Sequence, residues 1–205
     1  MASRRTSPVT DLALVAVFAG LIAAFTLTPA IPVGPLGVPI TLQTLAIGIT
    51  AMILGPWRGF AATALYVIAG LAGLPVLAGG GSGLGSLARP SAGYLLAFAL
   101  AALLIGFLAR WVIARQGRAR WGWLFVAGLA GSILLIHPMG IAGMSINGGL
   151  PLDKAFFADI AYWPGDLVKN AAAAAVAVAV HRAFPSLLVE SAVRHAPQRE
   201  TVSVG

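Results

Sequence analysis

The stretch Tyr162-Trp-Pro-Gly-Asp-Leu-Val-Lys-Asn170 places two opposite full charges just before the alanine and valine run Ala171–Val180. Proline suits the first position of a helix, so a helix that begins at Pro164 carries Asp166 in its first turn, near the positive end of the helix dipole. Lys169 then lies one turn further along the same face. A lysine at membrane depth costs roughly 2.5–3.5 kcal/mol on insertion scales. We interpret the pair as a polar anchor at the floor of a binding site; the alternative is a lysine that snorkels to the interface beside a helix-capping aspartate.

The composition is that of an integral membrane protein. Of the 205 residues, 59% are hydrophobic and 9% are charged, whereas a soluble domain carries about 25% charged residues. The absence of cysteine excludes disulfides, thiolate metal sites and cysteine nucleophiles. The net charge of +7 does not indicate a nucleic-acid partner, because the basic residues cluster between apolar segments, as in proteins oriented in a membrane.

Windows of about 20 apolar residues mark membrane spans. They predict six, at Thr10–Leu27, Ile40–Leu54, Gly59–Leu74, Gly93–Ile113, Trp121–Ile141 and Pro164–Ala183. The fold class is therefore an all-α membrane protein, a six-transmembrane-helix bundle that crosses the cell (inner) membrane. We expect a membrane domain over residues 10–184, between a cytoplasmic N-terminal segment, residues 1–9, and a cytoplasmic tail, residues 185–205. The first span follows Ser3-Arg4-Arg5, but five further apolar segments favour a retained helix over a signal peptide.

Six spans place both termini on one side of the membrane. Lys169 lies within a span, and of the other basic residues only Arg89 and Lys154 then fall on the opposite side. The side of the termini receives ten arginines: Arg4, Arg5, Arg58, Arg110, Arg115, Arg118, Arg120, Arg182, Arg194 and Arg199. Cytoplasmic loops are the ones enriched in basic residues, so the pattern predicts an N-in, C-in topology.

The connections on the outer side are long and rich in glycine and proline. They are Pro29–Pro39, Ala78–Ser91 and Ser145–Trp163. Irregular backbone at a membrane face is tolerated where it lines a cavity, so we expect a ligand lid on this side.

The glycine-rich outer loop between the third and fourth helices holds further candidate site residues. Glycines at this density allow a close approach of backbone N–H groups to a ligand, which makes Gly81 and Ser82 candidates; the alternative is a flexible linker. Arg89 and Tyr94 follow at the outer mouth. No phosphate-binding or dinucleotide glycine motif is present, and Ser82 lacks the second glycine of a nucleophile elbow.

Other polar residues lie within the predicted spans. Thr41 and Gln43 are either interhelical hydrogen-bond partners or pocket lining, and we favour the pocket. His137 shares no metal-ligand spacing with another histidine or a carboxylate, and it precedes Pro138, where a helix kink is expected. We interpret it as a hydrogen-bonded packing residue.

The first span carries small residues four positions apart, in the pairs Ala16/Gly20 and Ala19/Ala23. Such spacing lets two helix backbones approach closely. The face either contacts a helix of another subunit or packs inside this bundle.

Several motifs together resemble one known family in order and spacing. They are Val38-Pro-Ile-Thr-Leu-Gln-Thr44, Gly55-Pro-x-Arg-Gly59, Gly70-x-x-Gly-Leu-Pro-Val76, the loop Gly79–Gly85 with Pro90-x-x-Gly-Tyr94, and Pro164-Gly-Asp-x-x-Lys169. The chain resembles the BioY family, the biotin-specific substrate-binding S components of energy-coupling factor (ECF) transporters. The resemblance covers roughly Leu12 to Val180.

The resemblance implies a six-helix bundle that captures biotin from outside the cell. It also implies two kinds of partner, a transmembrane coupling subunit and a pair of cytoplasmic ATPases, contacted partly through the Ala19/Ala23 pattern. Asp166 and Lys169 match the family's ligand-contacting residues. The family's usual Gly-Pro-Thr-Gly-Gly-Tyr before the fourth helix is replaced here by Ala88–Tyr94, so Arg89 is a candidate on chemical grounds alone.

The chemistry of biotin suits these residues. The Asp166 carboxylate can accept hydrogen bonds from the ureido N–H groups. Lys169 can donate to the ureido carbonyl or pair with the carboxylate of the tail. Tyr66, Tyr94 and Trp163 can supply apolar walls.

We therefore predict a membrane transport subunit that is not an enzyme and uses no cofactor or metal, with ATP hydrolysis on partner subunits. One alternative is an autonomous secondary transporter of a small carboxylated solute, with Asp166 and Lys169 as an ion- or proton-coupled pair. A second is an intramembrane hydrolase built on Ser82 and His137, which requires the two groups within hydrogen-bond reach.

Overall fold

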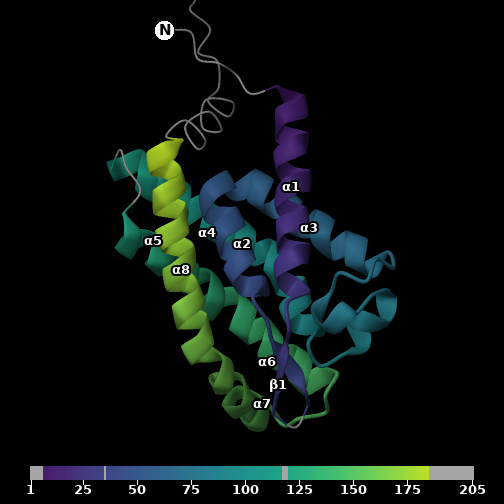
Figure 1. Ribbon diagram of the computed structural model, residues 1–205. Coiled ribbons are helices and arrows are strands. Elements are labelled where there is room, and N and C mark those ends of the chain that lie inside the picture. Colours follow the sequence, from purple (N-terminus) through teal and green to yellow (C-terminus); the bar gives the residue numbers. More distant parts are fainter. Residues whose placement is uncertain (1–6, 35, 117–119, 185–205) are drawn as a thin grey trace, which may run out of the picture.

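The computed structural model describes residues 7–34, 36–116 and 120–184, and most of them are helical (Figure 1). The predicted tail, residues 185–205, and Arg4, Arg5 and Arg118 lie outside the described residues. The α-helices are α1 (Pro8–Thr26), α2 (Gln43–Leu54), α3 (Pro56–Leu71), α4 (Ala92–Gln116), α5 (Trp121–Gly131), α6 (His137–Ile146), α7 (Leu152–Asp159) and α8 (Trp163–Ala183). The shorter elements are the strands β1 (Ile31–Val33) and β2 (Val38–Ile40), the 3-10 helices η1 (Ala78–Gly80), η2 (Leu84–Ala88) and η4 (Ile160–Tyr162), and the π-helical segment η3 (Ser132–Ile136).

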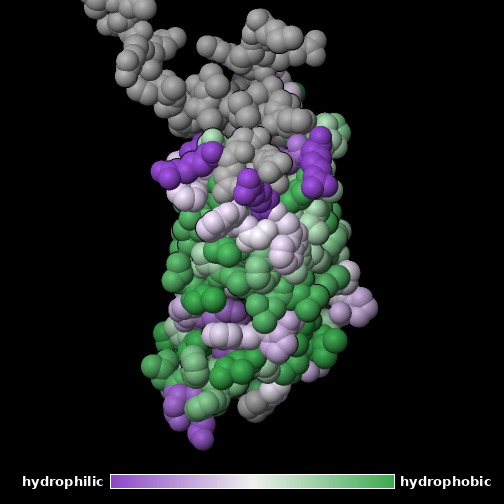
Figure 2. Space-filling view, turned by 90° about the vertical axis from the view of Figure 1, so that its left-hand side faces the viewer, coloured by the Kyte–Doolittle hydropathy of each residue, from purple (hydrophilic) through white to green (hydrophobic). Residues whose placement is uncertain are grey.

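The long helices have the length and composition of membrane spans. Among the described residues, three stretches are long and apolar enough to cross a membrane, namely Pro8–Thr26, Ala92–Arg115 and Trp121–Ile146. Figure 2 shows a broad hydrophobic belt on one side of the molecule, with hydrophilic residues near its two ends. The protein is a mostly helical, multi-pass integral membrane protein.

Helix α2 occupies the centre of the bundle and packs against α3, α4 and α8. It has 12 residues, nearly all of them buried. Small residues permit the close packing: a Cβ on Gly48 of α2 would lie 3.2 Å from Ala173 of α8, and one on Gly106 of α4 would collide with the Gly55–Pro56 turn. Because protein rather than lipid covers α2, a helix this short suffices at the centre of the bundle.

Helices α5 and α6 form one long element that the π-helical segment η3 interrupts. The sequence predicts a distortion here because of Pro138, and the structure confirms it. Proline lacks an N–H, and its ring collides with the carbonyl four residues earlier. That carbonyl belongs to Leu134, which lies within η3, so the wider π turn accommodates the proline without ending the helix.

The connections that the sequence assigns to the outer side are more ordered than expected, and they form what we call the loop end of the bundle (the β1–β2 hairpin, residues 72–91 and α7). The fold is therefore not strictly all-α. Residues 31–33 pair antiparallel with residues 38–40, with Pro32 opposite Pro39, so the two residues that cannot donate a ladder hydrogen bond lie opposite each other. In the glycine-rich loop, Gly79 and Gly80 have positive φ values of 67° and 72°, which favour glycine.

The start of α1 and the end of α8 both lie at the other end of the molecule, which we call the termini end (Figure 1). Ser7 caps α1 by accepting a hydrogen bond from the Thr10 N–H over 3.2 Å. Arg58, at the start of α3, forms an ion pair with Asp11 of α1. The long elements thus run between an arginine-bearing end and an end built of loops.

Candidate ligand-binding site

The predicted charge pair lies at the start of α8 and is buried. Asp166 is in the first turn, as predicted, and Lys169 Nζ donates to its Oδ1 over 2.8 Å. The Thr44 hydroxyl of α2 donates to the same oxygen over 3.0 Å and accepts from Lys169 Nζ over 3.1 Å. The Lys169 side chain is 13% exposed, so it turns inward to this triangle and does not snorkel to the interface. Buried charges are tolerated when they are paired and hydrogen-bonded, and this arrangement meets both conditions.

A cavity opens beside this pair, at the loop end of the bundle. Its wall comes from the β2–α2 segment, the glycine-rich loop, α4, η3, η4 and α8. The lining residues are Val38, Pro39, Ile40, Thr41, Gln43, Thr44, Leu77, Ala78, Ser86, Arg89, Ser91, Tyr94, Leu95, Phe98, Ile136, Tyr162, Asp166 and Lys169. The structure therefore brings six of the predicted site residues to one cavity: Thr41, Gln43, Arg89, Tyr94, Asp166 and Lys169.

Two further predicted residues lie directly behind the cavity wall. Tyr66 of α3 is 1% exposed; its hydroxyl accepts a hydrogen bond from Gln43 Nε2 over 2.8 Å and donates to the Val76 carbonyl over 3.2 Å. Gly81 lies against Arg89, since a Cβ at Gly81 would be 3.1 Å from Arg89 Nη1. Tyr66 thus orients Gln43, and Gly81 leaves room for the guanidinium group.

Arg89 is an exposed cation on the cavity wall. Asn147, which follows α6, holds its backbone in place: the amide Nδ2 donates to the carbonyls of Leu87 and Arg89 over 2.8 and 3.0 Å. None of the ion pairs among the described residues involves Arg89. The guanidinium group is therefore open to an anionic ligand group.

Two predicted site residues do not line the cavity. Ser82 is exposed, and its carbonyl accepts a hydrogen bond from the Ser86 hydroxyl over 3.3 Å. The prediction that Trp163 forms an apolar wall is also corrected: its indole packs on the His137 ring, with centroids 5.3 Å apart, and its Nε1 donates to Asp159 Oδ2 over 2.8 Å.

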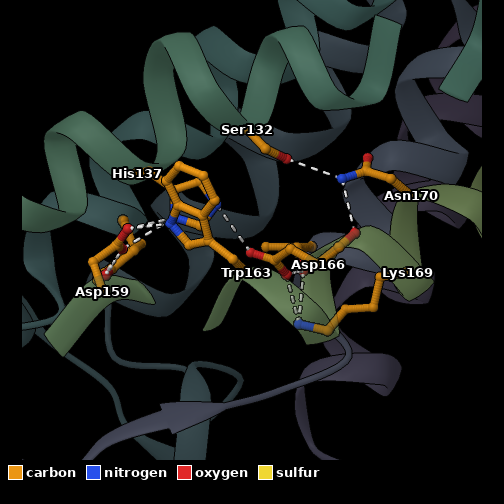
Figure 3. Close-up of polar contacts among 9 residues, drawn as sticks. Ser132, His137, Asp159, Trp163, Asp166, Lys169 and Asn170 are labelled. Atoms are coloured by element: carbon orange, nitrogen blue, oxygen red, sulfur yellow. Dashed lines mark hydrogen bonds and ion pairs between the residues drawn. The ribbon is translucent and has the colours of Figure 1, made fainter. Parts of the chain in front are cut away.

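Behind the charge pair lies a second polar cluster that the sequence does not predict (Figure 3). The prediction that His137 is a hydrogen-bonded packing residue is confirmed: its Nδ1 lies 2.9 Å from Asp159 Oδ2. Its Nε2 faces Asp166 Oδ2 at 3.6 Å. Both ring nitrogens thus face carboxylates, and neither is directed at Ser82, which removes the basis of the hydrolase hypothesis.

Asn170 extends the polar contacts of α8 into the bundle. Its Nδ2 donates to the Ser132 hydroxyl over 3.1 Å and to the Asp166 carbonyl over 3.0 Å (Figure 3). A Cβ on Gly128 of α5 would lie 2.2 Å from Asn170 Oδ1, so a glycine is required where the two helices meet. The first turns of α8 are therefore fixed against α5 and η3.

Tyr162 closes the cavity beside β2. Its hydroxyl donates to the Val38 carbonyl over 3.0 Å, and its ring meets Tyr94 edge to face, with centroids 5.9 Å apart. Burial and the nearby Asp159 carboxylate raise the pKa of Tyr162 from 10 to about 12. The hydroxyl consequently remains a neutral donor at physiological pH.

The small residues of α1 divide between two faces. Ala19 is 7% exposed and Ala23 is partly buried against the core, so this pair contributes to internal packing, and its assignment to a partner interface stays a prediction. Ala16 and Gly20 are exposed, and a Cβ on Gly20 would meet nothing within 4 Å. The outward small-residue face is thus the Ala16/Gly20 pair.

The chain is similar to known proteins over most of its length. A sequence profile of the BioY family matches residues 1–186. The chain is 35% identical over 179 residues to a biotin transporter BioY of Rhizobium etli, covering 86% of this chain and 96% of the relative. It is 37% identical over 194 residues to a biotin transporter BioY of Rhodobacter capsulatus, covering 87% and 97%.

A solved structure has the same fold. It is the crystal structure of the S-component for biotin from an ECF-type ABC transporter, which superposes with a TM-score of 0.81 at 26% sequence identity. The match covers 88% of this chain and 95% of that one. On the family match and the two relatives, this chain belongs to the BioY family.

Proposed function

We propose that this protein captures biotin from outside the cell as the substrate-specific subunit of an ECF-type, ATP-driven vitamin transporter. The relatives named as biotin transporters support the ligand, and the structural neighbour supports the role as an S component. The observation that carries the proposal is the buried Asp166–Lys169 pair on the wall of a cavity at the loop end.

The charges of the cavity favour one orientation of biotin. Asp166 and Lys169 neutralise each other, so together they offer an acceptor and a donor without net charge. This suits the ureido ring, which is neutral and carries two N–H donors and a carbonyl. Arg89 also lines the cavity and takes part in none of the ion pairs of the described residues, so it suits the carboxylate of the biotin tail. The ureido ring therefore binds at α8 and the tail points to the glycine-rich loop.

Apolar side chains lie between these two polar ends. Tyr94, Leu95 and Phe98 of α4 and Ile136 of η3 line the same cavity. They match the thioether ring and the methylene groups of the tail, whose burial releases water from apolar surface. Neither a metal nor a cofactor is part of this binding.

In the proposed topology, α1, α2, α3, α4, the α5–α6 element and α8 are six spans with both termini in the cytoplasm. The common position of the start of α1 and the end of α8 supports an even number of spans (Figure 1). The arginines support the orientation. The natural chain has no cysteine, so single-cysteine variants test it: a membrane-impermeant maleimide should label Ser82→Cys in intact cells and should label Ser7→Cys only after lysis.

Biotin uptake in this proposal depends on partner subunits. The chain lacks a nucleotide-binding motif, so ATP hydrolysis belongs to two cytoplasmic ATPases that act through a transmembrane coupling subunit. The exposed Ala16/Gly20 face of α1 supports a close contact with a helix of the coupling subunit. Uptake in cells that lack the ATPases, abolished by an uncoupler, would instead indicate secondary transport.

Calorimetric titration of biotin into the purified protein tests the proposed function. We expect saturable binding of one biotin per chain. Asp166→Asn should weaken it sharply, because the amide retains an acceptor but loses the charge that balances Lys169. Full-strength binding by this variant would contradict the site, and no binding by the wild-type chain would contradict the function.

A further inference from the structure

Asp159 is completely buried, yet it does not line the ligand cavity. It is the last residue of α7, in the connection between α6 and α8. In Figure 3 it lies on the far side of His137 from Asp166. A second buried carboxylate so close to a ligand site requires an explanation, because burying a charge is unfavourable unless it is paired and hydrogen-bonded.

Three hydrogen-bond donors from three different helices converge on this carboxylate. The Tyr94 hydroxyl of α4 lies 2.6 Å from Oδ1, and Trp163 Nε1 of α8 lies 2.8 Å from Oδ2. His137 Nδ1 of α6 lies between the two oxygens, 3.0 Å from Oδ1 and 2.9 Å from Oδ2. A carboxylate only accepts and has lone pairs for all three. An asparagine has one acceptor oxygen and would turn its NH2 group toward at least one donor. The position is therefore built for an aspartate.

The first of these donors belongs to the ligand cavity. Tyr94 lines the cavity, and because its hydroxyl is bound to Asp159, it offers the ligand its ring and not its hydroxyl. The ring lies against α6 where residue 140 is glycine; a Cβ there would be 2.1 Å from Tyr94 Cε1. The ring is thus held by Asp159 at its hydroxyl and by the backbone of α6 along its edge.

The second donor reaches the charge pair. His137 gives Nδ1–H to Asp159, which leaves Nε2 facing Asp166 Oδ2 at 3.6 Å. The Trp163 ring covers the same imidazole. Asp159 thereby fixes both the orientation of the imidazole and the nitrogen that faces the ligand-binding carboxylate.

We propose that Asp159 is a positioning residue of the biotin site. It keeps the Tyr94 hydroxyl turned out of the cavity and holds His137 in one orientation behind Asp166. The inference rests on the proposed function, since it concerns the affinity of the same cavity for biotin. It adds a specificity determinant that itself contacts no ligand: the anchored Tyr94 presents an apolar surface to the thioether part of biotin.

A double-mutant cycle on the full-length purified chain tests this role, with biotin affinity measured by calorimetry for Asp159→Asn, Tyr94→Phe and the double variant. We expect Asp159→Asn to weaken biotin binding by about tenfold or more, because it leaves donors of the cluster unsatisfied. Tyr94→Phe should weaken binding in the wild-type background and have little further effect in Asp159→Asn. Asp11→Asn is the matched control: it makes the same chemical change in an ion pair at the termini end, and we expect affinity within about twofold of wild type.

Two results would overturn the proposal. One is an affinity of Asp159→Asn equal to that of Asp11→Asn. The other is an equal effect of Tyr94→Phe in both backgrounds, because the hydroxyl would then act on the ligand directly. If the wild-type chain does not bind biotin, the proposed function is contradicted as well. If the wild-type chain binds biotin and Asp159→Asn binds it equally well, only this inference is contradicted.

A spectroscopic measurement on wild-type protein covers the case in which Asp159→Asn fails to fold. In protein labelled with nitrogen-15 at histidine, the signals of the other two imidazoles are identified from their loss in His181→Asn and His195→Asn. We expect the His137 signal to show a proton on Nδ1, with or without biotin. A neutral ring protonated on Nε2 alone would overturn the proposal, because Nδ1 would then not donate to Asp159.

Discussion

Replacing Lys169 with methionine tests the charge pair most severely. Methionine nearly preserves the length of the side chain but removes the charge and the two hydrogen bonds from Nζ to Asp166 and Thr44. In the proposed pose Lys169 also donates to the ureido ring, and a hydrogen bond that involves a charged group contributes about 1.5–3 kcal/mol. Losing that contact corresponds to an affinity for biotin about 10- to 150-fold weaker.

The assay is calorimetric titration of biotin into purified Lys169→Met, with Lys154→Met as the matched control. Lys154 is an exposed lysine of α7 at the same end of the molecule, so the control removes the same charge without touching the cavity. We expect the control to bind within about twofold of wild type, as for an exposed charge. Equal affinities of Lys169→Met and Lys154→Met would refute the argument that the buried pair grips the ligand.

Three other predictions concern the cavity wall. Arg89→Gln should weaken binding of biotin about tenfold or more but leave the affinity for biotin amide, which lacks the carboxylate, almost unchanged; equal losses for both ligands would place the tail elsewhere. Gly140→Ala puts a methyl group 2.1 Å from the Tyr94 ring, so it should lower the unfolding free energy by about 1–3 kcal/mol. A thermal-shift measurement should show this as a lower melting temperature. Gly20→Ala, with open space around it, serves as its control and should not destabilise the protein. The raised pKa of Tyr162 adds stability that is present below pH 10 and lost between pH 10 and 12; the Tyr162→Phe variant should lack that part of the alkaline decline, and an unchanged decline would contradict the burial of this hydroxyl.

The long apolar helices of the fold were predictable because each is encoded locally. Apolar runs mark α1, α4 and the α5–α6 element, and Pro138 marks the distortion within the last of these. The β1–β2 hairpin was not predictable in the same way: each strand has only three residues, and their apolar pattern does not distinguish a strand from a loop beside a membrane span. Helix α7 was not predictable for a similar reason, because its eight residues give only a weak periodic signal.

The site was predictable where its residues share one helical turn. Asp166 and Lys169 are three residues apart, so helix geometry alone places them on one face. Asp159 and His137 are 22 residues apart and meet only because α6, α7 and α8 fold against one another. The position of Trp163 could not be predicted from its place in the sequence. It lies close to Asp166 along the chain, but its indole turns away from the cavity because its Nε1 donates to the buried Asp159.

The decisive measurement is a structure of the protein with biotin bound, because it shows which residues hold each end of the ligand. We expect the ureido ring within hydrogen-bond distance of Asp166 or Lys169, the thioether ring against Tyr94, and the tail carboxylate near Arg89. Biotin bound outside this cavity, or inside it with its carboxylate at Lys169 and its ureido ring at the glycine-rich loop, would contradict the account.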